Sequence, residues 1–232
     1  MKTIGLLGGM SWESTLSYYK AINEGVKKEL GGFHSAKIVL YSVDFAEIEE
    51  FQNTGQWDKA GNLLAEAAKG VQCAGADFLL LCTNTMHNVV SQIEENIDIP
   101  VLHIADATAE ELLRNDVKKA GLLGTKFTME HDFYKNRIRE KFGIEVIIPG
   151  EDERNAVNDI IYDELCQGIK NYTSEEKILE IIKSLREDGA DAVILGCTEI
   201  SMIIGQEDTD IPLYDTTLIH ADAAVKKALK VP

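Results

Sequence analysis

Two similar segments of the chain carry the residues whose types and spacing are best suited to chemistry. The later one, residues 189–200, reads Gly-Ala-Asp-Ala-Val-Ile-Leu-Gly-Cys-Thr-Glu-Ile, which predicts a short apolar strand broken by a glycine, with Cys197 just beyond it. The earlier one, residues 75–85, reads Gly-Ala-Asp-Phe-Leu-Leu-Leu-Cys-Thr-Asn-Thr. When they are aligned on Gly-Ala-Asp, the offset is 114 residues, and Cys197 falls opposite Thr83 rather than Cys82. The sequence therefore predicts two equivalent positions, one a thiol and the other a hydroxyl.

A thiol and a hydroxyl at equivalent strand ends suit proton transfer to two faces of one carbon. Ligands of open α/β sheets bind outside the carboxyl ends of the strands. A cysteine at a helix N-terminus can have its pKa lowered from about 8.5 toward neutrality, which makes it a usable base. Two such groups facing each other across a pseudo-twofold axis can remove a Cα proton from an amino acid and return one to the other face without a cofactor. Because a threonine hydroxyl is a better donor or relay than base, we expect Cys197 to abstract and Thr83 to return the proton, at unequal rates in the two directions.

Three further matches indicate that the whole half-chain is duplicated. Residues 4–9 match residues 120–125 at an offset of 116, and residues 99–102 match residues 211–214 at an offset of 112. A weaker match relates Tyr18-Tyr19-Lys20 to Phe133-Tyr134-Lys135 at an offset of 115. Matches in the same order at nearly constant offset are best explained by an internal repeat.

Each half is predicted to be a small α/β lobe. Short apolar strands are expected over 3–7, 37–43, 78–83 and 100–104, and again over 120–124, 145–148, 192–195 and 212–214, with helices between them. Among the helices, one is expected over 156–169, and another is expected to open on a Thr173-x-x-Glu176 capping box. This alternation predicts an α/β fold of two pseudo-symmetric lobes, each a parallel four-stranded sheet flanked by helices, with the active site in the cleft between them. The expected lobes are 1–104 and 105–214, and a last helix over 215–232 can pack back on the first. Because strand side chains alternate, Cys82 is expected to face the helices rather than the site.

Composition restricts the possible partners. The net charge of −16 over 232 residues argues against nucleic acid, whose phosphates such a chain repels. No apolar run approaches the roughly 20 residues that span a bilayer, so no membrane partner is expected and a cytoplasmic location is the simplest interpretation. The four cysteines lack a CxxC pair and are expected to be free thiols. The histidines have no metal-ligand spacing, and the glycine-rich turns fit no nucleotide motif, so neither a metal nor another cofactor is expected.

The chain resembles the cofactor-independent aspartate/glutamate racemase family from end to end. The matching stretches are Gly-Leu-Leu-Gly-Gly-Met at 5–10, Asn84-Thr85, Gly124-Thr125 with Thr128, and Gly196-Cys197-Thr198-Glu199. The resemblance implies an isomerase that inverts the α-carbon of aspartate or glutamate between a catalytic pair in two pseudo-symmetric lobes. It also implies that the hydroxyls and backbone N–H groups of the Asn-Thr and Cys-Thr turns hold the α-carboxylate. The substrate-binding residues so expected are Met10, Asn84, Thr85, Thr125, Thr128, Thr198 and Glu199.

Two departures from the family pattern refine these expectations. The usual Cys-Asn-Thr of the first lobe is here Thr83-Asn84-Thr85, which resembles a subgroup of aspartate/glutamate-specific racemases that pair one threonine with one cysteine. The loop over 44–52 has no basic residue, although aspartate-preferring relatives carry one there. Gln52 is therefore expected to contact the side-chain carboxylate of the substrate instead.

Two other functions remain open from the sequence. Relatives of this superfamily with a single working cysteine decarboxylate small diacids or isomerise them between cis and trans forms, and Thr83 is compatible with such a site. A carboxylate-binding module whose catalysis lapsed with the first cysteine is the other alternative. The resemblance also makes a homodimer plausible, and the sequence does not distinguish aspartate from glutamate as the substrate.

Overall fold

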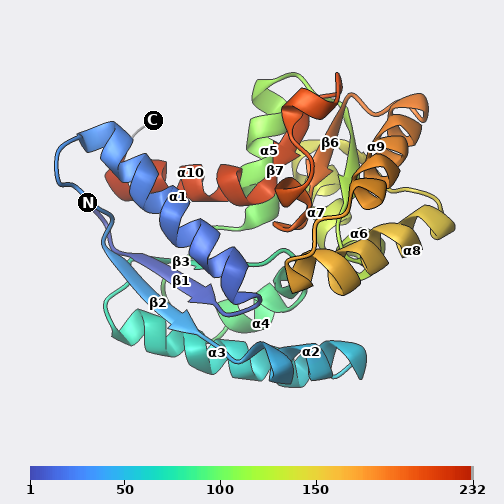
Figure 1. Cartoon of the computed structure of the whole chain (residues 1–232). Coiled ribbons are helices and arrows are strands. Elements are labelled where there is room, and N and C mark those ends of the chain that lie inside the picture. Colours follow the sequence, from blue (N-terminus) through green and yellow to red (C-terminus); the bar gives the residue numbers. More distant parts are fainter. Residues whose placement is uncertain (231–232) are drawn as a thin grey trace. The chain divides into compact units, whose positions relative to one another are not determined.

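The computed structural model describes residues 1–230 and divides the chain into two compact units (Figure 1). The first unit comprises Met1–Ile104 together with the chain from His220 onward, and the second comprises Ala105–Ile219. The chain passes between the units twice, at the start of helix α5 (Ile104–Arg114) and within helix α10 (Thr216–Leu229). Of the helix expected over 215–232, residues 231 and 232 lie outside the described part of the chain.

The first unit is built on a parallel sheet with the strand order β2-β1-β3. Its strands are β1 (Ile4–Gly8), β2 (Ile38–Ser42) and β3 (Phe78–Leu81). Its helices are α1 (Trp12–Leu30), α2 (Phe45–Asn53), α3 (Trp57–Cys73) and α4 (Val90–Glu94), with a 3₁₀ helix over Thr85–Val89. Helix α1 begins where the Ser11 hydroxyl accepts a hydrogen bond from the Ser14 N–H (3.3 Å).

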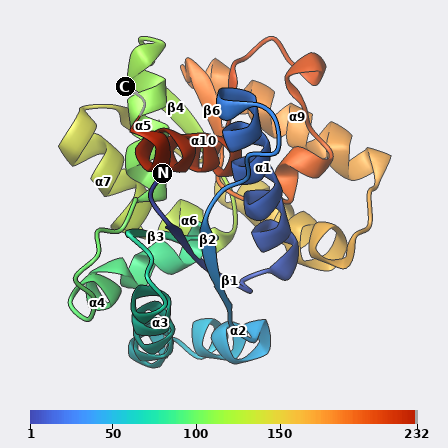
Figure 2. The same cartoon turned by 90° about the vertical axis from the view of Figure 1, so that its left-hand side faces the viewer.

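Helices cover both faces of this sheet (Figures 1 and 2). Helices α1 and α10 pack on one face, where Phe78, Leu80 and Cys82 point, and α3 packs on the other, where Leu79 and Leu81 point. These side chains are all completely buried, as expected for parallel strands covered on both sides. The expectation that Cys82 faces the helices is therefore confirmed.

The second unit contains a four-stranded parallel sheet in the order β5-β4-β6-β7. Its strands are β4 (Lys119–Leu123), β5 (Glu145–Ile147), β6 (Ala192–Leu195) and β7 (Leu213–Asp215). Its longer helices are α5, α6 (Lys126–Glu130), α7 (Asp132–Phe142), α8 (Glu151–Asp159) and α9 (Tyr172–Glu187). Short 3₁₀ helices cover Leu165–Gln167, Ile200–Met202 and Gln206–Asp208, and a π-helix covers Ile160–Glu164.

The strand pairing of the two units repeats residue by residue. Strand β1 pairs with β3 so that Leu7 lies opposite Leu81, and β4 pairs with β6 so that Leu123 lies opposite Leu195. Strands β2 and β5 occupy the same place on the other side of the central strand. The duplication inferred from the sequence therefore holds at the level of sheet register.

The first sheet has three strands where the sequence predicted four. The strand expected over 100–104 reduces to a single bridge between Val101 and Leu79. Two backbone hydrogen bonds flank this bridge: the Leu79 N–H donates to the Pro100 carbonyl (3.0 Å), and the Leu102 N–H donates to the Leu79 carbonyl (2.8 Å). The ladder stops there because proline has no N–H and helix α5 begins only two residues after Leu102.

Two predicted helices differ from the observed ones. Helix α9 is capped by Asn171, whose side chain accepts a hydrogen bond from the Thr173 N–H (3.1 Å), so the predicted capping box at Thr173 is wrong. The asparagine therefore forms the cap two residues before the predicted position. The helix expected over 156–169 begins earlier, at Glu151, and continues as the π-helix and a 3₁₀ turn.

Within residues 1–230, no helix combines the length and the apolarity needed to cross a bilayer.

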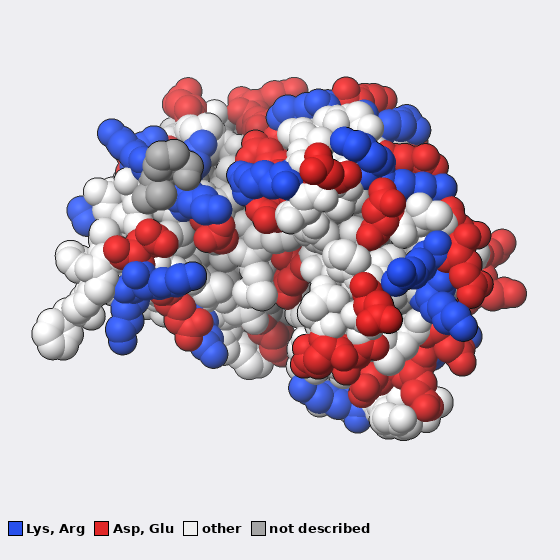
Figure 3. Space-filling view, turned by 90° about the horizontal axis from the view of Figure 1, so that it is seen from above, with Lys and Arg blue, Asp and Glu red and all other residues white. Residues whose placement is uncertain are grey.

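Acidic and basic side chains are interspersed on the face of the molecule shown in Figure 3. Ion pairs also form within single helices, such as Lys226 with Asp222 (2.7 Å) and Lys69 with Glu66 (2.6 Å). Exposed pairs of this kind contribute little to stability. The chain as a whole has a net charge of −16, which repels an anionic substrate. Such a substrate therefore needs hydrogen-bond donors within the binding site itself.

Candidate active site

Cys197 emerges from the end of β6 through a turn that only glycine fits. The Gly196 N–H donates to the Leu123 carbonyl (2.6 Å), which extends the pairing of β6 with β4 by one residue. A Cβ atom on Gly196 would lie 2.8 Å from that same carbonyl oxygen and 3.4 Å from a methyl group of Thr128. The close approach of the Gly196 and Leu123 backbones fixes the direction in which the chain turns. Cys197, the next residue, is half-buried.

The Cys197 thiol is hydrogen-bonded to the carboxylate of Glu199. The Sγ–Oε2 distance is 2.9 Å, and the Thr198 hydroxyl donates to the same carboxylate oxygen at 2.6 Å. Glu199 is buried, with 7% of its surface exposed. A thiol that donates to a buried carboxylate has a proton acceptor in place, which is an arrangement suited to general-base chemistry.

The resting thiol is held in its neutral form. Burial raises the pKa of Cys197 well above its usual value, and the charge of Glu199 raises it further because a neighbouring anion disfavours the thiolate. The sequence-based expectation of a lowered pKa is wrong for this arrangement. It relied on a helix N-terminus, but only a three-residue 3₁₀ helix, Ile200–Met202, follows Cys197.

Substituting Glu199 by glutamine is expected to lower the pKa of the Cys197 thiol. The change removes both the negative charge and the carboxylate that accepts the thiol proton, and both favour the neutral thiol. The midpoint of iodoacetamide alkylation at Cys197, followed by peptide mass spectrometry across pH, should move to lower pH. Exposed Cys73 provides the internal control, since its midpoint should stay unchanged. A shift to higher pH at Cys197 would show that Glu199 does not act on the thiol as the geometry indicates.

Thr125 and Thr128 lie beside the Cys197 turn in the second unit. The Thr125 side chain caps helix α6 by accepting from the Thr128 N–H (3.4 Å), and the two hydroxyl oxygens are 3.3 Å apart. Thr128 is completely buried, and it packs within 3.4 Å of where Cβ atoms would stand on Gly124 and Gly196. The structure therefore brings together the second unit's five predicted site residues: Thr125, Thr128, Cys197, Thr198 and Glu199.

Thr83 occupies the equivalent place in the first unit. It stands two residues beyond the end of β3, as Cys197 stands two residues beyond the end of β6. Thr83 is half-buried, whereas Asn84 and Thr85 are buried with 6% and 8% of their surfaces exposed. Burial also raises the pKa of the Cys82 thiol, which lies on the helix-covered side of the sheet and is unsuited to act as a base.

Gln52 reaches the Thr83 turn from helix α2. Its side chain is buried, and its amide Nε2 donates to the sulfur of Met86, one residue beyond Thr85, at 2.9 Å. Met10 is buried in the core cluster that also contains Met86. The structure thus places Gln52 beside the turn that carries Thr83, Asn84 and Thr85, and buries Met10 in the core of the same unit.

The turn after β1 depends on two glycines. Gly9 has a φ of 93°, and its N–H donates to the Thr15 hydroxyl at 2.8 Å. A Cβ atom on Gly8 would lie 2.4 Å from the Thr15 side chain. Thr15 therefore fixes the glycine turn to helix α1, a role that the sequence analysis missed because Thr15 lies six residues after Gly9.

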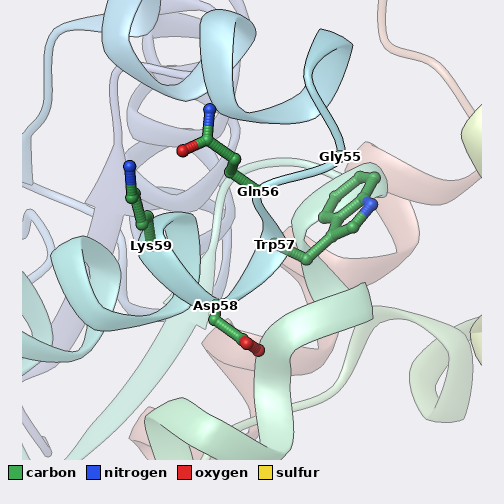
Figure 4. A pocket seen from close by; sticks show the side chains of 5 residues that line it. All are labelled: Gly55, Gln56, Trp57, Asp58 and Lys59. Carbon is green, nitrogen blue, oxygen red and sulfur yellow. The ribbon is translucent and has the colours of Figure 1, made fainter.

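A hollow of about 450 Å³ lies where helix α2 leads into α3, and none of the candidate residues lines it (Figure 4). It is lined by Gly55, Gln56, Trp57, Asp58 and Lys59, and the Trp57 and Lys59 side chains project in different directions. Its residues include neither a nucleophile nor a convergent set of donors.

Among residues 1–230, no group of three or more His, Cys, Asp or Glu side chains is placed to hold a metal ion.

Comparison with known proteins gives consistent matches over nearly the whole chain. The model of the Asp/Glu/Hydantoin racemase family matches residues 7–224. A structure from Yersinia pestis, provisionally named an Asp/Glu racemase, is 52% identical with a TM-score of 0.94, covering 99% of this chain and 100% of that one. An aspartate racemase homologue from Pyrococcus horikoshii is 37% identical with a TM-score of 0.86 and the same coverage. The broad specificity amino-acid racemase RacX of Bacillus subtilis is 25% identical over 97% of this chain and 98% of its own length.

Proposed function

Because the chain belongs to the Asp/Glu/Hydantoin racemase family and is an isomerase, we propose that it racemises aspartate or glutamate by proton transfer at Cys197 and Thr83. The equivalence of these two residues in their sheets carries the proposal. Thr83 follows β3, which pairs with β1, and Cys197 follows β6, which pairs with β4. Each residue stands two positions after the last residue of its strand. A pseudo-symmetric pair of this kind suits a substrate whose two enantiomers differ only in which face of the α-carbon carries the proton.

Cys197 and Glu199 act as the base of the proposed reaction. The thiol passes its proton to the Glu199 carboxylate, and the resulting thiolate takes the α-proton of the substrate. The 2.9 Å hydrogen bond between the two groups supports this first transfer. The raised pKa of the thiol also makes its thiolate a stronger base for a weakly acidic C–H bond, once it forms.

Thr83 returns a proton to the opposite face of the carbon. Its hydroxyl donates, and solvent replaces the lost proton, while the Cys197–Glu199 pair releases the proton that it gained. Protons therefore balance over one turnover without an added cofactor. Because two enantiomers have equal free energies, the kcat/KM values of the two directions must be equal, although kcat and KM can each differ.

The carboxylates of the substrate are assigned to local donors. The Asn84-Thr85 and Cys197-Thr198 turns offer hydroxyls and backbone N–H groups for the α-carboxylate, where negative charge develops when the α-proton leaves. Gln52 is assigned to the side-chain carboxylate. Its amide now donates to the Met86 sulfur, a weak acceptor, and a carboxylate would be a stronger partner for it.

Proton NMR in D₂O tests the proposal with the wild-type protein and each enantiomer of aspartate and glutamate. Loss of the α-proton signal together with formation of the other enantiomer, measured by chiral chromatography, is the expected result for at least one of the two amino acids. Release of CO₂ from a small diacid without α-exchange would favour the decarboxylase instead. Binding without either reaction would favour a carboxylate-binding module.

A further inference from the structure

The structure assigns His87 the role of a positioning residue that holds the main chain of Thr83, an inference that rests on the proposed catalytic role of Thr83. His87 lies in the 3₁₀ helix Thr85–Val89, four residues after Thr83. Its Nδ1 atom lies 2.9 Å from the Thr83 carbonyl oxygen. On the other side of the ring, the N–H of Ile104 lies 3.3 Å from Nε2. The imidazole thus links the Thr83 peptide to the start of helix α5.

The two partners of His87 define which nitrogen carries the proton. A backbone N–H can only donate, so Nε2 must accept from Ile104 and carries no hydrogen. A carbonyl oxygen can only accept, so Nδ1 must carry the hydrogen and donate it to Thr83. The ring is therefore a neutral Nδ1–H tautomer, because a proton on Nε2 would face the Ile104 N–H.

A second buried histidine in the same unit also bonds through both ring nitrogens, but with the opposite tautomer. His220 accepts from the Tyr18 hydroxyl at Nδ1 (2.8 Å), and its Nε2–H donates to the Leu102 carbonyl (2.8 Å). Burial lowers the pKa of His220 to about 4, so this ring is also neutral near pH 7. The ring centroid of His87 lies 4.5 Å from that of His103 and 6.1 Å from that of His220. Two further imidazoles therefore lie close to His87, and all three histidines are buried.

The position of this cluster in the chain explains what His87 can do. The main chain leaves the first unit after Ile104 and returns to it at His220, so the cluster lies where both passages meet the first unit. His87 is the member of the cluster that reaches a proposed catalytic residue. Thr83 follows the end of β3, where the ladder no longer restrains its peptide. The hydrogen bond from His87 therefore sets the orientation of that peptide, and with it the direction of the hydroxyl that must face the α-carbon.

Two substitutions separate this role from that of an ordinary core histidine. In His87→Asn, the amide nitrogen can replace Nδ1 as the donor to Thr83, while Ile104 loses its acceptor. In His87→Gln, the amide oxygen can replace Nε2 as the acceptor for Ile104, while Thr83 loses its donor. Tyr18→Phe is the matched control, because it removes a hydrogen bond from the same cluster but none from Thr83.

The readouts are thermal unfolding, α-proton exchange into D₂O and inversion of configuration, all measured on the full chain. We expect His87→Gln to reduce inversion by about 10²-fold while exchange at the Cys197 face persists, as displacement of one reacting group predicts. His87→Asn should keep inversion within about fivefold of wild type, because the donor to Thr83 remains. Tyr18→Phe should lower the unfolding temperature without changing the ratio of inversion to exchange.

Equal loss of exchange and inversion in both His87 variants, in proportion to their loss of stability, would overturn the assignment and leave His87 as a core residue. A measurement on the wild type serves if the variants do not fold: ¹⁵N–¹H correlation of the imidazole should show His87 protonated at Nδ1. A proton at Nε2 would also overturn the assignment. Failure of the proposed function is recognised separately, because inversion would then be absent from the wild type or unaffected by Thr83→Ala.

Discussion

Replacing Cys197 with alanine is expected to abolish exchange of the substrate α-proton with solvent. The substitution removes the group that takes the proton and leaves Glu199 alone, without the thiol to which it is hydrogen-bonded. Loss of a positioned general base costs about 10²–10⁴-fold in rate, and we expect a loss toward the upper end because Thr83 is a poor base. The measurement is incorporation of deuterium at Cα of aspartate and glutamate, followed by proton NMR with both enantiomers as starting material.

Cys73→Ala is the matched control for this experiment. Cys73 is an exposed free thiol at the end of α3, so its removal should leave exchange unchanged. Retention of most exchange by Cys197→Ala would show that another group abstracts the proton and would contradict the proposed role. Thermal unfolding of the variant should stay close to that of the wild type, because Cys197 is only half-buried.

Replacing Thr83 with alanine is expected to separate exchange from inversion. Cys197 and Glu199 would still remove the α-proton and return a deuteron to the same face, so exchange with retained configuration should continue from the enantiomer that Cys197 serves. Delivery to the other face requires the hydroxyl, and its loss should slow inversion by about 10²-fold or more. Proton NMR and chiral chromatography on the same samples give both rates.

Thr83→Ser is the conservative companion, since it keeps the hydroxyl and should keep inversion. Its inversion rate should exceed that of Thr83→Ala by a wide margin. If Thr83→Ala inverts as fast as the wild type, or if serine is no better than alanine, the hydroxyl is not the second proton donor. If instead exchange and inversion fall together, Thr83 contributes to substrate binding rather than to proton return.

The equivalent strand-end positions of Thr83 and Cys197 could be predicted from the sequence because strand geometry is rigid. The same Gly-Ala-Asp sequence precedes both strands. Because each residue of a parallel strand pairs in turn with its neighbour, equal spacing from this sequence gives residues 78–81 and 192–195 the same register in their sheets. The orientation of Cys82 follows from the same alternation. Local patterns of this kind are read well from a sequence because each depends on neighbours within a few residues.

Other features depended on contacts that no local pattern contains. His220 donates to a carbonyl 118 residues away in the sequence, and His87 accepts from an N–H 17 residues away. Burial raises the pKa of Cys197, and the rotamer of Glu199, which turns its carboxylate back toward the thiol, raises it further. The missing fourth strand of the first sheet depended on how early helix α5 begins after Pro100. The two histidine hydrogen bonds are tertiary contacts, whereas the rotamer of Glu199 and the start of α5 are local details that residue propensities do not specify.

The discontinuity of the first unit has a consequence for the order in which the protein can fold during synthesis. Helix α10 covers the face of the first sheet on which Ile4 and Phe78 are buried, and the N–H of Lys2 donates to the carbonyl of Ala228 (2.9 Å). The ribosome makes Lys2 and Ala228 more than 200 residues apart, so α10 can complete the cover that α1 begins on that face only after the second unit has been made. The second unit, continuous from 105 to 219, has all its residues before the first unit does. The first unit therefore receives its last helix after every residue of the second unit has been made.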